Sequence, residues 1–421
     1  MTIQDDSLPL DWKITDSEVN LQEIQAAKVR IQRHVPVTPV TRSLFNSDRL
    51  GAGVFFKLEN FNITGSFKIR GAGNALLSDQ SRDSKSQVIA ASAGNHAQGV
   101  AYMARLLGRK ATIFMPERTP MVKVVATKSH GAEVILTGAV YDDAFQAALE
   151  FKTKNGGTLV HAFADAAVIN GQGTVGLEII DQLPNVGVVV VPIGGGGLIG
   201  GIGCAVKAAR PGIKVIGVQT KSFPAMKESL AAGKIVGTTS GMTIADGIAV
   251  KRPSSRTLSL AQHYVDDILL VNDDDIAAAI MSLMEKDHVL AEGAGAAGVA
   301  ALQVYSEKLK ELAGGKDICC VVCGGNIDVT LLGRIANRGL IATGRMMRLT
   351  VRMADRPGQL AELLQAIGKI GANLIDLRHN RHFGALYYSD VDVEIDLETI
   401  DFTHQDLIKQ TLTKMGMRYQ A

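Results

Sequence analysis

The stretch at residues 87–108, QVIAASAGNHAQGVAYMARLLG, decides the fold class of this chain. Its apolar run Val88–Ala91 predicts a buried strand, and residues 92–95 predict a turn. After the turn, apolar residues recur at helical spacing until Gly108, which is typical of a helix end. A strand followed directly by a helix is the repeating unit of a parallel sheet with crossover helices.

The same unit recurs along most of the chain. Strands are predicted at Ala111–Met115 and at residues 134–136, and a helix is predicted after each of them. Residues 186–193 are continuously apolar, as in a strand that is buried on both faces. Other predicted elements are helices at 141–154 and 171–183 and strands at 215–219 and 318–322. We therefore expect a doubly wound α/β core.

A second kind of pattern begins after a linker predicted at residues 338–346. Residues 348–353 alternate between apolar and polar side chains, as in a half-buried strand. The predicted order from there is strand, helix, strand, strand, helix, strand, which is the ferredoxin-like order. Its first five elements are placed at residues 348–353, 359–370, 373–379, 385–397 and 404–415. The chain of 421 residues is thus expected to hold a catalytic-sized domain at 1–337 and a smaller domain at 347–421.

Composition narrows the class of partner. The formal net charge is +2, and no basic run with interleaved aromatic residues suggests nucleic acid. The N-terminus lacks the pattern of an export signal, and the most apolar segment, 186–202, is rich in glycine in its second half, so we expect no membrane span. Four cysteines without paired CxxC spacing fit a reducing cytoplasm and predict neither a structural zinc site nor a disulfide framework. Small molecules are the expected partners.

A glycine tetrad follows the most apolar strand. Residues 192–198, PIGGGGL, open a helical segment and present free backbone amides at the positive end of a helix, which predicts a phosphate site. A plain flexible turn and a nicotinamide-binding loop are alternatives. The tetrad does not keep the G-x-G-x-x-G spacing, and no acidic residue stands about 20 residues further on in a suitable place.

Three more motifs carry side chains or backbone groups that could bind a cofactor or take part in a reaction. In residues 64–71, TGSFKIRG, a lysine lies beside an aromatic ring and between glycines, where a flat cofactor can approach it. In residues 92–99, SAGNHAQG, backbone amides and polar side chains can bind a carboxylate or a phenolate oxygen, although simple helix capping is an alternative. Cys323 in CGGN could face a ring nitrogen, or it could be an ordinary buried cysteine.

Taken in this order, the motifs resemble those of the fold-type II pyridoxal-phosphate enzymes, and within them the threonine dehydratases. The resemblance covers residues 35–339 and includes TIADGIAVK at 243–251. It implies a two-lobed core similar to the tryptophan synthase beta chain, with the smaller lobe, residues 60–160, inserted in the larger. It also implies conversion of L-threonine to 2-oxobutanoate and ammonia, with L-serine giving pyruvate as a side activity.

The resemblance also implies roles for individual residues. Lys68 would bind pyridoxal 5'-phosphate as a Schiff base and move the α-proton, Phe67 would pack on the ring, and Asn95 would hold the ring oxygen. Glu292 would line the cofactor and Cys323 would face its ring nitrogen. The phosphate cradle would be Gly194, Gly195, Gly196, Gly197 and Leu198, and the substrate carboxylate would meet Ser92, Asn95 and His96.

Departures from related enzymes refine the prediction. Cys323 stands where most of the family has serine; it is a neutral group that favours elimination over transamination. Ala93 replaces the second proton-transfer serine of serine racemases, and Gln219 and Ala225 lie where those enzymes bind a divalent ion, so neither racemisation nor a metal site is expected. A serine dehydratase, a serine racemase and a catalytically silent amino-acid sensor remain as alternatives.

The C-terminal residues, 347–421, resemble the ACT family. Their loop DRPGQL at 355–360 would place an amino-acid effector at a helix start, with Asp355, Gly358 and Leu360 as contacts. Some ACT domains only dimerise, so effector binding and dimerisation are both open. A single copy of such a domain favours a homo-oligomer, either a dimer or a tetramer.

Overall fold

The computed structural model describes residues 18–79, 86–239, 241–380 and 390–420. It divides into two compact units, Met1–Asp328 and Val329–Ala421, and each is described by itself. The division falls ahead of the linker predicted at residues 338–346, and helix α14 (Val329–Ala342) belongs to the second unit. The predicted domain bounds stay predictions.

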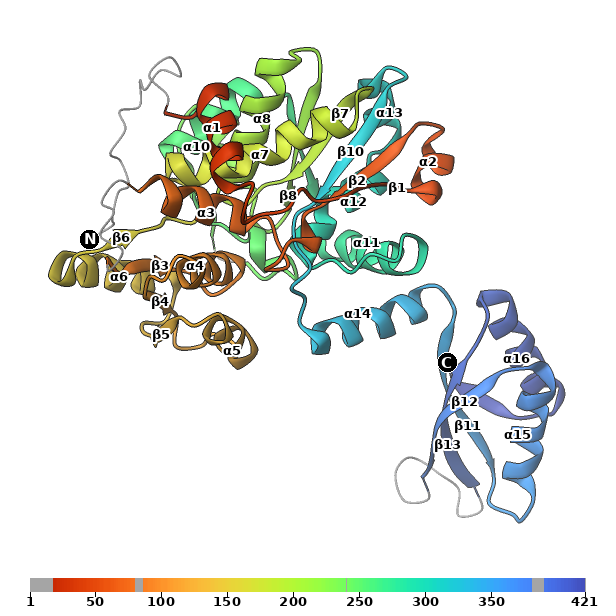
Figure 1. Cartoon of the computed structure of the whole chain (residues 1–421). Coiled ribbons are helices and arrows are strands. Elements are labelled where there is room, and N and C mark those ends of the chain that lie inside the picture. Colours follow the sequence, from red (N-terminus) through yellow and green to blue (C-terminus); the bar gives the residue numbers. More distant parts are fainter. Residues whose placement is uncertain (1–17, 80–85, 240, 381–389, 421) are drawn as a thin grey trace. The chain divides into compact units, whose positions relative to one another are not determined.

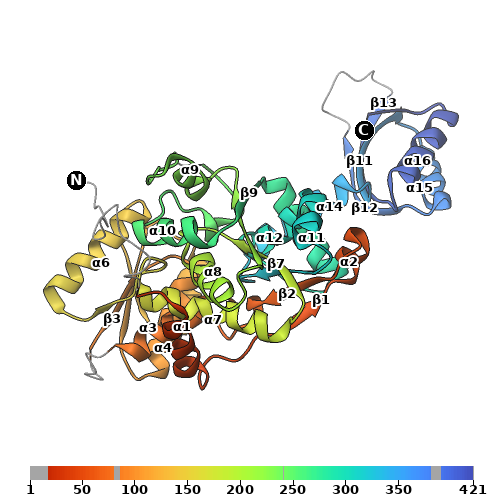
Figure 2. The same ribbon diagram turned by 90° about the horizontal axis from the view of Figure 1, so that it is seen from above.

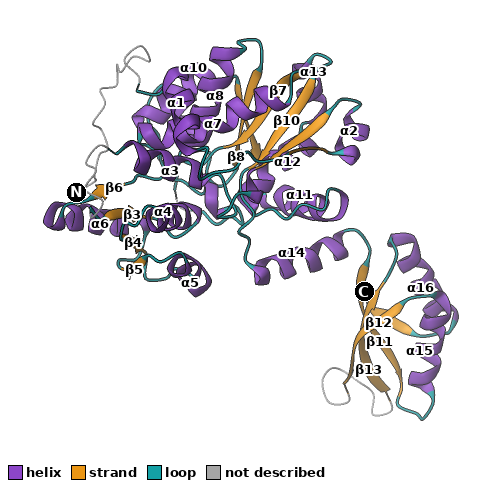
Figure 3. Cartoon of the chain, viewed as in Figure 1, coloured by secondary structure: helices purple, strands orange, loops and turns teal. Residues whose placement is uncertain are grey.

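The larger sheet of the first unit has the strand order β1-β2-β10-β7-β8-β9. All neighbouring strands are parallel except β1 and β2. Helices α7 and α8 cover one face and α12 and α13 the other (Figures 1 and 3), which explains why every residue of β7 is buried. The strands are β1 (Val40–Arg42), β2 (Val54–Leu58), β7 (Val186–Pro192), β8 (Lys214–Thr220), β9 (Asp267–Val271) and β10 (Asp317–Val322).

Nine helices of the described residues belong to the part of the first unit that holds the larger sheet. They are α1 (Leu21–Ile31), α2 (Leu44–Leu50), α7 (Ala166–Gln182), α8 (Gly197–Ala209), α9 (Ala225–Ala232), α10 (Ser255–Tyr264), α11 (Asp273–Lys286), α12 (Gly293–Val304) and α13 (Ser306–Ala313). Two short 3-10 turns, η2 (Glu59–Phe61) and η3 (Asp246–Ile248), lie in connections between these elements.

The smaller sheet has the order β5-β4-β3-β6, and all its strands are parallel. Side chains of β3 alternate between two cores: Val88 and Ala90 pack on the side of α4, and Ile89 and Ala91 on the side of α6. Because helices cover both faces, the whole strand is buried. The elements are α3 (Lys68–Ser78), β3 (Val88–Ala91), α4 (Asn95–Leu106), β4 (Ala111–Met115), α5 (Met121–Ser129), β5 (Glu133–Leu136), α6 (Tyr141–Asn155) and β6 (Thr158–Leu159).

Glycines let α3, α7 and α8 approach one another closely (Figure 2). A Cβ on Gly171 of α7 would lie 2.6 Å from the Cα of Gly71 in α3, and a Cβ on Gly201 of α8 would lie 2.7 Å from the N of Gly173. Neither position has room for a side chain. Helix α7 therefore connects the beginning of α3 with the helix that follows the glycine tetrad.

The second unit confirms the predicted ferredoxin-like order. Its antiparallel sheet has the order β12-β13-β11-β14, and buried residues such as Val351 and Ile395 pack in the core formed with α15 and α16. The elements are β11 (Met346–Ala354), α15 (Gln359–Ile370), β12 (Asn373–Asn380), β13 (Asp390–Glu398), α16 (Phe402–Lys414) and β14 (Arg418–Gln420).

The start of one predicted helix differs from the structure by several residues. The helix predicted at residues 171–183 begins earlier, at Ala166, because Asp165 caps it by accepting a hydrogen bond from the Ala167 N–H. The described part of strand β13 is Asp390–Glu398, and residues 385–389 of the strand predicted at 385–397 lie outside the described residues. In the described part of the chain, no helix is long and apolar enough to cross a membrane.

Candidate active site

One cavity of about 1620 Å³ in the first unit brings the predicted catalytic, cofactor and substrate residues together. They come from several parts of the chain that are distant in sequence, and they meet where strands β3, β7 and β10 end. The predicted residues that line it are Phe67, Lys68, Ser92, Asn95, His96, Gly194, Gly195, Gly196, Gly197, Leu198, Glu292 and Cys323.

Lys68 is the first residue of α3 and lies at the cavity wall. Its Nζ donates a hydrogen bond to the carbonyl oxygen of Ala162 at 3.0 Å and lies 5.1 Å from the ring centroid of Phe67. Burial lowers the pKa of Lys68 to about 8, although Cys323 and Glu292 oppose the shift. At pH 7, roughly a tenth of this amine is thus unprotonated and available as a nucleophile or a base, far more than for an exposed lysine.

The lysine motif and the cysteine motif lie side by side. Ser66 and Gly324 form an isolated antiparallel bridge, and the N–H of Phe67 donates to the carbonyl of Cys323 at 3.1 Å. Cys323 directly follows β10 and is buried, and burial raises the pKa of its thiol, so it stays neutral. A neutral thiol and a buried amine therefore share one wall of the cavity.

A chain of amide groups leads to a buried carboxyl. The Nδ2 of Asn326 donates to the Oδ1 of Asn95 at 2.8 Å, and the Nδ2 of Asn95 donates to the Oε1 of Glu292 at 2.7 Å. Burial and the nearby Asp246 raise the pKa of Glu292 to about 7, while Asn95 lowers it less. We assigned no role to Asn326 from the sequence; its place in the CGGN motif was the one available signal.

The glycine tetrad has the geometry of an anion cradle. Gly196 has φ +94° and precedes α8, so the first turn of α8 has no capping side chain from that residue. A Cβ on Gly195 would lie 2.3 Å from the ring of Phe163. The loop lies so close to Phe163 that only glycine fits there, and its amides at a helix start suit a phosphate group.

The loop after β3 offers a second set of amides. The N–H of Gly94 donates to Ser92 Oγ at 3.2 Å, and α4 begins at Asn95 with glycine before it. The Nε2 of His96 donates to the carbonyl of Val160 at 2.9 Å, which leaves a lone pair on Nδ1. Burial and Lys68 lower the pKa of His96 to about 3, so this neutral ring suits a carboxylate poorly, and its backbone N–H is the better donor.

Other residues were singled out from the sequence because they differ from those of serine racemases. Ala93 lines the cavity with a side chain that carries no exchangeable proton. Gln219 is buried, and its Oε1 accepts from the Lys227 N–H at 2.9 Å. Among the described residues there is no group of three or more His, Cys, Asp or Glu side chains suited to a metal ion, and the absence of a metal site stays a prediction.

The predicted effector residues lie in the second unit. Asp355 and Gly358 belong to the loop between β11 and α15, and Leu360 packs against the core of that unit. Gly358 has φ +94°, and a Cβ there would meet no atom within 4 Å, so the conformation of the backbone, not space, favours glycine.

Comparison with known proteins agrees with this geometry. Residues 31–324 match the family model described as "Pyridoxal-phosphate dependent enzyme". An L-threonine ammonia-lyase of Thermotoga maritima is 44% identical over 399 residues, which are 94% of this chain and 98% of that protein.

Solved structures are similar as well. The processed form of threonine deaminase isoform 2 from Solanum lycopersicum has a TM-score of 0.71 and 36% identity, covering 75% of this chain and 86% of that one. A maize serine racemase has a TM-score of 0.72 and 33% identity, covering 77% of this chain and 99% of that one. The fold-type II core expected from the sequence is confirmed. This chain belongs to the family of pyridoxal-phosphate dependent enzymes.

Proposed function

We propose that this enzyme converts L-threonine to 2-oxobutanoate and ammonia, and L-serine to pyruvate more slowly. The observation that carries the proposal is a single cavity in which the buried amine of Lys68 shares its walls with the glycine tetrad. The relative named L-threonine ammonia-lyase, which matches almost the whole chain, supports the choice of substrate.

The residues of the cavity fit pyridoxal phosphate. Lys68 would hold it covalently, the tetrad its phosphate, Phe67 its ring and Asn95 its ring oxygen, with Glu292 beside it. When bound, the cofactor supplies an electron sink that makes the α-proton of an amino acid removable. Once released from it, the Lys68 amine would take that proton, and Ala162 O is within reach to orient the amine.

The cavity also favours elimination over other outcomes. The amides at the start of α4, near Ser92 and His96, would bind the substrate carboxylate and fix its orientation. Cys323 is a neutral thiol and places no negative charge near the ring nitrogen. Ala93 offers no proton to the opposite face of the substrate, so racemisation is disfavoured.

Replacement of Lys68 tests the proposal. Lys68→Ala should lose covalent cofactor and all measurable 2-oxobutanoate formation, whereas the exposed Lys110→Ala should keep both. If Lys68→Ala dehydrates threonine at the wild-type rate, the proposal is wrong. Comparison of threonine and serine turnover, with chiral analysis of recovered serine, separates the serine dehydratase and racemase alternatives. A wild-type protein that is labelled by borohydride and cofactor but releases no keto acid would be a sensor instead.

We also propose that the second unit binds an amino acid through the loop of Asp355, Gly358 and Leu360, and that the chain forms a dimer or tetramer. Backbone amides at the start of α15 support effector binding. Threonine turnover with and without each branched-chain amino acid, in the wild type and in Gly358→Val, tests the first part, and sedimentation tests the second. A cytoplasmic location is expected from the four free, buried cysteines.

A further inference from the structure

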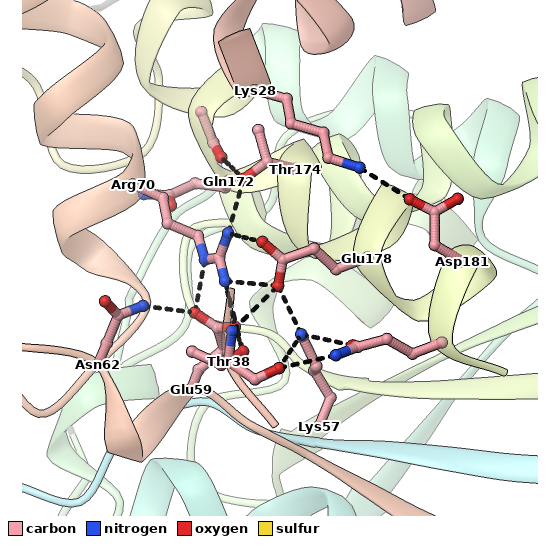
Figure 4. Close-up of polar contacts among 12 residues, drawn as sticks. Lys28, Thr38, Lys57, Glu59, Asn62, Arg70, Gln172, Thr174, Glu178 and Asp181 are labelled. Carbon is pink, nitrogen blue, oxygen red and sulfur yellow. Dashed lines mark hydrogen bonds and ion pairs between the residues drawn. The ribbon is translucent and has the colours of Figure 1, made fainter. Parts of the chain in front are cut away.

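Four charged side chains lie together in the interior of the first unit. They are Lys57 of β2, Glu59 of η2, Arg70 of α3 and Glu178 of α7, and we call them the Arg70 cluster (Figure 4). Each side chain is 5% exposed or less, and none of the four is among the described residues that line the cavity. Two positive and two negative groups leave the cluster without formal net charge.

Arg70 clamps two carboxylates from different elements. Its Nε and Nη2 donate to the two oxygens of Glu59 at 2.7 and 2.9 Å. Its Nη1 and Nη2 donate to the two oxygens of Glu178 at 2.6 and 2.8 Å, and Nη1 also donates to Thr174 Oγ1 at 3.1 Å. A lysine at this position could not make two bidentate contacts, because its single nitrogen lacks the planar fork of donors.

Lys57 completes the cluster from the larger sheet. Its Nζ donates to Glu178 Oε2 at 2.5 Å, to the carbonyl of Thr38 at 2.8 Å and to Gln182 Oε1 at 2.8 Å. Strand β2, turn η2 and helix α7 are therefore all connected to one guanidinium on α3.

Stability alone explains such a cluster poorly. Well-packed apolar residues of similar volume are often as stabilising as a buried ion pair, because desolvation offsets most of the attraction. What the cluster adds is a defined geometry. Arg70 lies in the first turn of α3, two residues after Lys68, while Ser66, two residues before Lys68, pairs with Gly324. The lysine thus lies between two fixed points of the backbone.

We propose that Arg70 is a positioning residue, whose clamp on Glu59 and Glu178 fixes the first turn of α3 and thereby the place of the Lys68 amine in the cavity. The inference rests on the proposed function, since it concerns the amine that would hold the cofactor and move the proton. A misplacement of about 1 Å in a reacting group can lower a rate about a hundredfold.

The first test is Arg70→Lys, which keeps the charge and removes the fork. Two quantities are measured: the rate at which the cofactor-free chain takes up pyridoxal phosphate covalently, followed by absorbance, and kcat and KM per loaded site. We expect kcat to fall by about a hundredfold with the KM for threonine unchanged, and uptake to slow as well. Wild-type uptake and wild-type kcat in this variant would overturn the proposal.

A second variant separates positioning from stability. Arg70→Met leaves one uncompensated negative charge, whereas Arg70→Met with Glu59→Gln restores charge balance and keeps the Lys57–Glu178 pair. We expect the double variant to regain much of the unfolding free energy lost in Arg70→Met but neither kcat nor the uptake rate. Joint recovery of stability, kcat and uptake would overturn the proposal.

A matched control uses a partly buried ion pair elsewhere in the first unit. Arg109 lies 3.1 Å from Asp79, with side chains 8% and 14% exposed, and neither residue lines the cavity in the part of the chain described. Arg109→Met with Asp79→Asn should lower stability and leave kcat per loaded site and cofactor uptake unchanged. Equal loss of uptake in the control would also overturn the proposal. If the wild type does not turn over threonine, the proposed function fails, and the uptake rates still decide the role of Arg70.

Discussion

The Arg70 cluster and the cavity around Lys68 both hold ionisable side chains in the interior of the first unit, but they are paired differently. In the cluster, burial opposes the charge of Glu59, yet Arg70, Lys57 and Thr38 together outweigh it and lower the pKa of that carboxyl. In the cavity, burial prevails and moves the pKa of Lys68 down to about 8 and that of Glu292 up to about 7.

The difference lies in the partners supplied. Arg70 meets two carboxylates directly, whereas Lys68 donates to a neutral carbonyl and Glu292 accepts from a neutral amide. Lys57 is intermediate, because burial lowers its pKa in spite of Glu178. Full pairing fixes charge and geometry, and incomplete pairing leaves groups that exchange protons near neutral pH.

The largest expected effect on stability comes from removing one charge of the Arg70 cluster. Lys57→Met leaves the cluster with an uncompensated negative charge and should lower the free energy of unfolding by about 3–5 kcal/mol. Urea unfolding of the cofactor-free chain measures it. Lys57→Met with Glu178→Gln restores balance and should recover part of the loss; an unchanged midpoint in the single variant would contradict the account.

The incompletely paired carboxyl of Glu292 in the cavity should make the stability of the chain depend on pH. The pKa of Glu292 rises from 4.5 to about 7 on folding, so the folded chain binds the proton more tightly. Stability contributed by that proton is present below pH 4.5 and is lost as pH rises through about 7, at most about 3 kcal/mol in all. Glu292→Gln should remove this loss between pH 5 and 8, and parallel curves for both proteins would contradict it.

Adding a methyl group to the glycine tetrad should have a smaller effect. Gly195→Ala would force a Cβ against the ring of Phe163 and displace the tetrad. We expect cofactor affinity to weaken by about 1–3 kcal/mol, the usual cost of overpacking. Equilibrium titration with pyridoxal phosphate measures it. Gly212→Ala, where a Cβ meets no atom within 4 Å, is the control, and equal affinities in both variants would count against the cradle.

The smallest effect on stability is expected for an ion pair that is fully hydrogen-bonded but exposed to solvent. In the second unit, Arg348 makes two hydrogen bonds to Asp396, at 2.6 and 2.7 Å, and its side chain is 56% exposed. Exposed pairs contribute little to stability. Arg348→Ala should leave the thermal midpoint unchanged within error, and a loss comparable to that of Lys57→Met would show that burial is not what distinguishes the cluster.

Local patterns in the sequence predicted most of the fold. The spacing of apolar side chains indicates which faces of a strand are covered. It therefore predicted the fully buried strand Val88–Ala91 and the half-buried strand β11. Helix α7 begins at Ala166, before the predicted residue 171, because the capping side chain of Asp165 was not recognised in the sequence. The ferredoxin-like order followed from the change of period and is confirmed.

The site was predictable only as far as its motifs extend. The motifs placed Lys68, the tetrad and Asn95 in one cavity, but the Arg70 cluster joins residues that are 11, 108 and 121 positions apart. Residues so far apart in the sequence form no periodic pattern that would indicate their contact. The sequence also does not distinguish a buried glutamate from an exposed one. The neutral state of His96 depends on its burial and on the nearby Lys68, and the sequence alone could not place that ring in the interior.

Part of the cavity is built from backbone groups alone. The carbonyl of residue 162 would be present whichever amino acid occupied that position. Substitutions in residues 160–164 would therefore leave the acceptor for Lys68 in place. Relatives that differ at residue 162 can therefore share this contact. A comparison of side-chain identities would miss this shared contact. Testing the contact requires an ester in place of the peptide bond, because substitution of a side chain leaves the carbonyl oxygen unchanged.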